Sequence, residues 1–150
     1  MKRLCAAFAA LVLCYSCTQN KAVQPTYFAD AFSYSKTVKQ LNEVVKFVGF
    51  SPIVASRNYA YANIAAYECI AAGYPKEYNS LAGQIHGLVS MPKADPAKQV
   101  DYEFASILAF CKVGEAVTFP EGSMKDYTDS LKALVKSGVH TAAPVPIAHC

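Results

Sequence analysis

Hydrophobic residues recur every three to four positions along most of this 150-residue chain, a spacing that predicts amphipathic helices. In the stretch 33–48 the apolar positions form one stripe, and lysine, glutamine and glutamate side chains take the opposite face. The same spacing predicts helices over 80–89, 97–117 and between 123 and 138. No run of five or more residues alternates in the manner of a strand. With a further helix over 53–72, the pattern predicts an all-α bundle of about five helices.

The helix predicted over 53–72 is apolar on nearly every side, and only Arg57 and Glu68 carry charge within it. A helix without a polar face lies either at the centre of a bundle or in a membrane. Its asparagines, tyrosines and charges argue against a membrane, so we expect a central helix. Ser51 and Pro52 precede it, and these residue types are preferred at the cap and at the first helical position.

Local signals also indicate where the other helices begin and end. Gly49 is expected to end the first helix, because glycine is favoured just past a helix C-terminus. Asp95 followed by Pro96 repeats the cap signature before the fourth predicted helix. In the short third helix, Gly83 and Gly87 each cost about 1 kcal/mol relative to alanine, so that helix requires tertiary packing.

The first seventeen residues resemble the signal peptide of a bacterial lipoprotein. Lys2 and Arg3 precede an apolar run of about ten residues, well short of the roughly 20 that span a bilayer. Ser16 then precedes Cys17, as in the lipobox whose cysteine receives the lipid, although Cys14 stands where that motif prefers leucine. We therefore expect lipidation at Cys17, export to the periplasm or outer membrane, and contact with a membrane through the lipid anchor. An ordinary cleaved signal peptide is the alternative.

These features divide the chain into four parts. We expect a signal peptide over 1–17, a polar tether over 18–30, a helical domain over 31–138 and an irregular tail over 139–150. The tail has no helical period and no acidic or basic residue apart from histidine. Because it follows an amphipathic helix so abruptly, we interpret it as a sign of truncation, with a shifted reading frame as one explanation.

Composition narrows the classes of protein to which the chain can belong. Hydrophobic residues make up 53% of the chain and charged residues 17%, which excludes intrinsic disorder. The net charge is +3, and without Lys2 and Arg3 the basic and acidic residues nearly balance. We therefore expect no nucleic-acid partner, since such proteins carry a basic surface.

Three cysteines remain if the signal peptide is removed and Cys17 is lipidated: Cys69, Cys111 and Cys150. None of them has the spacing of a metal site. Cys69 and Cys111 fall within apolar helical patterns, where a cysteine usually behaves as a small buried hydrophobe. A disulfide between these two is the alternative in an oxidising compartment.

The stretch 51–68, which reads SPIVASRNYAYANIAAYE, carries a family resemblance. It resembles a helix near the start of exported bacterial proteins related to vanadium-dependent haloperoxidases, within the type-2 phosphatidic acid phosphatase superfamily. The stretches 78–84 and 91–96 are similar to the lipoprotein branch of that family. The resemblance covers about 28–135 and implies that the chain is the N-terminal portion of a larger haloperoxidase-like helical fold.

In that family the chemistry lies later in the chain, in Lys-x6-Arg-Pro, Ser-Gly-His and Arg-x5-His motifs that hold phosphate or vanadate. An oxyanion requires such convergent cationic donors. This sequence lacks all three motifs. The stretch 137–140 resembles Ser-Gly-His, but a valine separates Ser-Gly from the histidine. The resemblance therefore implies no catalytic, cofactor-binding or metal-binding residue here, with vanadate as a cofactor of the intact family member only.

Arg57, Tyr61 and Glu68 are the candidate site residues of this chain. Eleven residues bring Arg57 and Glu68 to within about 20° of each other around a helix, and Tyr61 lies on the same face. One interpretation is that this face borders the active-site cavity of a longer protein. The interpretation that we favour is structural, with both charges paired to other helices because unpaired buried charge is costly.

The expected function is that of an N-terminal fragment of an exported haloperoxidase- or phosphatase-like enzyme, itself inactive. The intact protein would hydrolyse phosphate esters, or oxidise halide when vanadate is bound, and it alone would take the small-molecule substrate. The alternative is a complete small all-helical envelope lipoprotein that acts as a binding or scaffolding module. A metal-binding helical protein is disfavoured, because His86 has no acidic residue three or four positions away.

Overall fold

The computed structural model describes residues 30–137, which form four α-helices and no strand. The helices are α2 (Ala31–Val48), α3 (Pro52–Gly73), α4 (Tyr102–Ala116) and α5 (Lys125–Lys136). The predicted all-α fold is confirmed, with four helices in this range in place of about five. None of these four combines the length and apolar character needed to cross a bilayer. The predicted signal peptide with Cys17, most of the tether and the tail fall outside the described residues.

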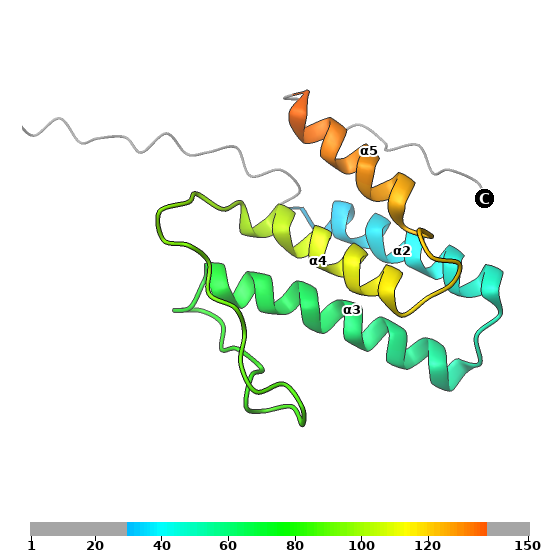
Figure 1. Ribbon diagram of the computed structural model, residues 1–150, viewed down its shortest axis with the longest axis horizontal. Coiled ribbons are helices and arrows are strands. Elements are labelled where there is room, and N and C mark those ends of the chain that lie inside the picture. Colours follow the sequence, from blue (N-terminus) through cyan, green and yellow to red (C-terminus); the bar gives the residue numbers. More distant parts are fainter. Residues whose placement is uncertain (1–29, 138–150) are drawn as a thin grey trace, which may run out of the picture.

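Helix α4 occupies the centre of the arrangement (Figure 1). It packs along α3 and also contacts α2 and α5. Gly73 at the end of α3 lies against the ring of Tyr102 at the start of α4, so these two helices run antiparallel. The expectation that the helix over 53–72 would be central is wrong for this part of the chain. Helix α3 leaves one side open, where Ile53 and Val54 are exposed.

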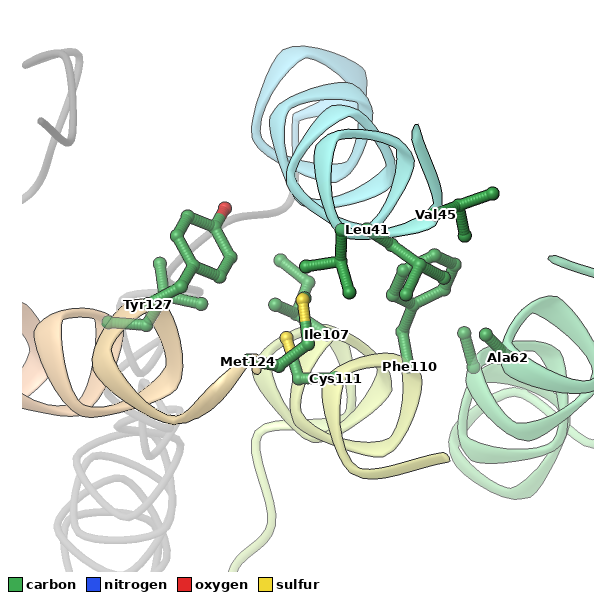
Figure 2. Packing of buried hydrophobic residues seen from close by; sticks show 11 residues of the cluster. Leu41, Val45, Ala62, Ile107, Phe110, Cys111, Met124 and Tyr127 are labelled. Atoms are coloured by element: carbon green, nitrogen blue, oxygen red, sulfur yellow. The ribbon is translucent and has the colours of Figure 1, made fainter. Parts of the chain in front are cut away.

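The hydrophobic core lies where α2, α4 and α5 meet, with small side chains of α3 at its edge (Figure 2). Phe110, Leu41 and Ile107 are its largest fully buried aromatic and aliphatic side chains. Ala62 of α3 belongs to the same buried cluster as Phe110. On α4, a Cβ on Gly114 would lie only 3.1 Å from a methyl carbon of Leu41. The absence of a side chain at Gly114 therefore sets how closely α2 approaches α4.

Tyrosine hydroxyl groups connect the helices across this core. Tyr127 of α5 and Thr37 of α2 share a buried hydrogen bond of 2.9 Å between their hydroxyl oxygens. Tyr59 of α3 donates to Oδ1 of Asn42 in α2 at 2.7 Å. A buried tyrosine requires such a partner for its hydroxyl group. These bonds fix the helices in register where apolar packing alone is not directional.

The segment 80–89, predicted as a helix, is a series of turns. Gly83 and Gly87 have φ angles of 78° and 87°, in the left-handed region that a right-handed helix excludes. The backbone nitrogen of Gly83 donates to the carbonyl oxygen of Leu88 at 2.7 Å and closes the loop. The helix prediction was wrong because these glycines use their conformational freedom to turn the chain.

Helix α4 begins five residues later than predicted, because Asp101 caps it in place of Asp95. Oδ1 of Asp101 accepts a hydrogen bond from the backbone nitrogen of Phe104 at 2.9 Å. Asp95 instead caps an isolated turn, in which its Oδ1 accepts from the backbone nitrogen of Ala97 at 3.0 Å. Both aspartates carry a valid cap signal, and the packing of Tyr102 against α3 selects the second.

Candidate functional site

Glu68 is the candidate site residue that the fold buries, with 3% of its surface exposed. Its Oε2 accepts a hydrogen bond from the Ser80 hydroxyl group at 2.7 Å, and its Oε1 accepts from the backbone nitrogen of Leu81 at 2.6 Å. Hydrogen bonds to a carboxylate are among the stronger ones in proteins. The Glu68 side chain therefore fastens the turn segment that follows α3 back onto that helix.

Tyr67 strengthens the same attachment from the neighbouring position. Its hydroxyl group donates to the carbonyl oxygen of Asn79 at 2.9 Å. Its ring also meets the ring of Tyr78 edge-on, with 6.3 Å between the ring centres. Together with the Glu68 bonds, these contacts hold four consecutive residues, 78–81, against the second half of α3.

Arg57 and Tyr61 lie on the surface of α3, and Tyr61 is 48% exposed. Eleven residues separate Arg57 from Glu68, which amounts to about 16 Å along the helix axis. The three residues share a face of α3 without meeting in one site of the described chain. Their place beside a cavity of a longer protein stays a prediction.

A groove of about 570 Å³ opens between α2, α3 and α4, within the size range of small-molecule sites. Its walls are mainly apolar. The residues that line it come from all three helices and from the cap of α2: Asp30, Ala31, Tyr34, Asn63, Ala66, Tyr67, Ile70, Glu103, Ser106 and Ile107. Sequence reasoning missed this groove, because no spacing along the chain connects residues on three different helices.

The hydrogen-bond donors along the groove are largely engaged by the protein itself. The Tyr34 hydroxyl group donates to Oδ1 of Asn63 at 2.7 Å, and Nδ2 of Asn63 donates to the carbonyl oxygen of Tyr59 at 2.8 Å. Burial raises the pKa of the Tyr34 hydroxyl group, which therefore keeps its proton at neutral pH. The Tyr67 hydroxyl group is held by its bond to the turn segment.

The described residues do not fit a phosphate or vanadate site. Among residues 30–137, no three His, Cys, Asp or Glu side chains gather closely enough to hold a metal ion. The single arginine and single histidine of that range, Arg57 and His86, are both exposed, one on α3 and one in the turn segment. An oxyanion requires several cationic donors that converge.

Both cysteines in the described range are free, so the alternative of a disulfide between Cys69 and Cys111 does not hold in this structure. Cys111 is fully buried in the core, which confirms its prediction as a small buried hydrophobe. Burial raises the pKa of its thiol to about 11. Cys69 is only partly buried, and burial raises the pKa of its thiol as well.

We expect Cys111 to resist iodoacetamide at pH 8 in the folded chain and to react after unfolding in urea. The thiolate is the nucleophile, and a thiol with a pKa of about 11 is almost entirely protonated at pH 8. Peptide mass spectrometry measures the modification, with the more accessible Cys69 as the internal comparison. Modification of Cys111 at equal rates in buffer and in urea would contradict its burial.

The same shift predicts how stability depends on pH. Between about pH 9 and pH 11 the folded chain keeps a proton on the Cys111 thiol, whereas the unfolded chain, with a thiol pKa near 9.0, releases it. The protonated, buried thiol therefore contributes to the stability of the folded chain. This contribution to the free energy of unfolding is therefore complete below about pH 9 and declines as the pH rises toward 11.

Neither a protein-family model nor a curated protein matches the chain. A solved structure does match: a bacterial vanadium-dependent iodoperoxidase superimposes with a TM-score of 0.65 and 38% sequence identity. The fold is haloperoxidase-like. The match covers 69% of this chain and 25% of the iodoperoxidase chain, so this chain spans about a quarter of that protein's length. This similarity agrees with the resemblance that the stretch 51–68 carries.

Proposed function

We propose that the chain is the N-terminal part of a haloperoxidase- or phosphatase-like protein and has no catalytic activity by itself. The observation that carries the proposal is the structural match to the iodoperoxidase, which extends over only a quarter of that protein. Phosphate-ester hydrolysis or vanadate-dependent halide oxidation, with its small-molecule substrate, then belongs to the intact protein. Such chemistry requires several converging cationic donors, whereas Arg57 and His86, the single arginine and histidine of residues 30–137, lie exposed on different elements.

The proposal includes export and attachment to a membrane. Its support is the sequence of the first seventeen residues, in which a charged start, a short apolar run and the Ser16–Cys17 pair follow one another. Lipidation of Cys17 would place the helical domain in the periplasm or at the outer membrane, with the lipid anchor as its contact with the membrane. Nucleic acid is not among the proposed partners.

Activity assays test the central part of this proposal. The purified chain, supplied with orthovanadate, hydrogen peroxide and iodide or bromide, should produce no oxidised halide above the blank without protein. It should likewise not hydrolyse p-nitrophenyl phosphate. An established vanadium haloperoxidase assayed in parallel shows that the conditions support turnover.

Turnover that elutes with the protein in gel filtration would overturn the inactive-fragment proposal. An Arg57→Ala variant then tests whether the activity belongs to this chain, since Arg57 is the sole arginine among residues 30–137. A matched Lys76→Ala variant, which removes an exposed charge in the turn segment, serves as the control.

The alternative function, a small helical envelope lipoprotein that binds a ligand or partner, is favoured by the groove between α2, α3 and α4. A groove of about 570 Å³ with mainly apolar walls is of the size that a binding module uses. This alternative requires no residue of the catalytic motifs.

A further inference from the structure

Among residues 30–137, the charged side chains that line the groove between α2, α3 and α4 are both acidic. They are Asp30 and Glu103, and no lysine, arginine or histidine of that range lines it. Hydrogen bonds from the side chain and backbone of Ser33 hold the pKa of Asp30 below its usual value, so this carboxylate is ionised at neutral pH. The ion pairs of residues 30–137 involve neither Asp30 nor Glu103. A ligand of opposite charge is therefore favoured here.

The hydrogen-bonding groups of the groove mostly offer acceptors. The Ser106 hydroxyl group donates to the carbonyl oxygen of Glu103 at 2.7 Å, so its own oxygen can still accept. Oε1 of Glu103 accepts from the hydroxyl group of Tyr74. A carboxylate has about four acceptor positions, so capacity remains after this one bond. A ligand that brings N–H donors complements these groups.

The remaining walls suit a hydrocarbon body. Ala66, Ile70 and Ile107 contribute apolar surface, and the small side chain of Ala66 leaves room between α3 and α4. Tyr34 and Tyr67 also line the groove. Their aromatic side chains add to the surface on which a hydrocarbon body can lie.

We propose that this groove binds a small apolar primary ammonium compound. The hydrocarbon body lies over the alanine and isoleucine side chains, and the ammonium group lies toward Asp30 and Glu103. Charge complementarity, spare acceptors and an apolar wall together select this class over carboxylates, which would meet two negative charges, and over neutral alcohols. The proposal rests on the groove alone and is independent of the haloperoxidase-like relationship.

Calorimetric titration at pH 7 with 2-phenylethylammonium tests the proposal directly. We expect saturable binding, about tenfold tighter than that of 2-phenylethanol, because the ammonium group brings a full positive charge to the two carboxylates whereas the hydroxyl group is neutral. 3-Phenylpropanoate, with a similar body and opposite charge, should show no binding. Equal affinities for the amine and the alcohol, or no saturable amine binding, would overturn the proposal.

Two variants connect the binding to the groove. Glu103→Gln keeps an acceptor for Tyr74 and removes the charge, and Asp30→Asn keeps a residue that caps α2 well. Each should weaken amine binding about tenfold, whereas Glu77→Gln in the exposed turn segment should leave it unchanged. Circular dichroism verifies that each variant is folded, and either folded groove variant suffices for the test. Wild-type affinity in a folded groove variant would show that the amine binds elsewhere.

Discussion

Replacement of Phe110 by alanine is expected to lower the free energy of unfolding by about 3–5 kcal/mol. The Phe110 side chain has no exposed surface and lies between α2 and α3 in the core (Figure 2). Its ring meets that of Tyr34 edge-on, with 5.6 Å between ring centres. The truncation removes these contacts and leaves a cavity where three helices meet. Urea-induced unfolding followed by circular dichroism measures the loss.

Phe47→Ala is the matched control, because the Phe47 side chain is 75% exposed at the end of α2. We expect this surface change to stay within about 0.5 kcal/mol of wild type. If Phe110→Ala abolishes the cooperative transition altogether, the milder Ile107→Val should still show a loss of about 0.5–1.5 kcal/mol. Equal effects of the two phenylalanine variants would contradict the described core.

Replacement of Glu68 by alanine is expected to cost about 2–4 kcal/mol of unfolding free energy. The variant loses both hydrogen bonds to the turn segment and leaves the Leu81 N–H without its 2.6 Å acceptor. The carboxylate is the side chain that connects α3 to Ser80 and Leu81, so these two residues should detach locally. Urea unfolding measures the global cost, and hydrogen exchange at the Leu81 amide measures the local detachment.

Glu68→Gln separates the charge of this side chain from its shape. The amide keeps one acceptor oxygen, so we expect roughly half of the loss seen with alanine and partial protection of Leu81. Glu43→Ala is the surface control, since Glu43 pairs with Lys46 in an exposed i,i+3 bridge worth at most about 1 kcal/mol. Unchanged Leu81 exchange in Glu68→Ala would refute the anchoring role.

The pattern of apolar residues predicted α2 and α3 almost to the residue. The stretch 33–48 became Ala31–Val48, and 53–72 became Pro52–Gly73. Local information specifies both helices: an amphipathic period and Gly49 at the end for α2, and Pro52 at the first position and Gly73 at the end for α3. Gly49 indeed ends α2 with a φ angle of 72°. Such signals act within a few residues, so a sequence pattern captures them.

The two segments whose structure was predicted wrongly carry local signals that are weak or that favour two alternatives equally. In 80–89, a short apolar stripe competes with Gly83 and Gly87, and the bonds from Ser80 and Leu81 to α3 favour the turned conformation. At the start of α4, both Asp95 and Asp101 are suitable N-cap residues. In both cases contacts with α3, distant in sequence, decided between local alternatives.

For the candidate site, too, the sequence indicated a residue but not its tertiary contacts. The sequence marked Glu68 as one of two charges in an apolar helix, and the structure buries this side chain. It did not reveal its partners, because Ser80 and Leu81 reach Glu68 only through the path of the turn segment. No sequence pattern predicts the groove, since its lining residues Tyr34, Asn63 and Glu103 come from three helices.

The sequence by itself determined the all-α class, the position of two long helices and the haloperoxidase-like resemblance, because periodicity and residue-specific motifs are written along the chain. Only the tertiary structure decided that α4 is central and that α3 leaves one side open. It also decided that three helices line a groove with mainly apolar walls and two acidic side chains. The physical reason is that packing depends on how side chains from separate segments fill shared space. Gly114 against Leu41 illustrates this, because a single missing side chain on α4 sets the position of α2.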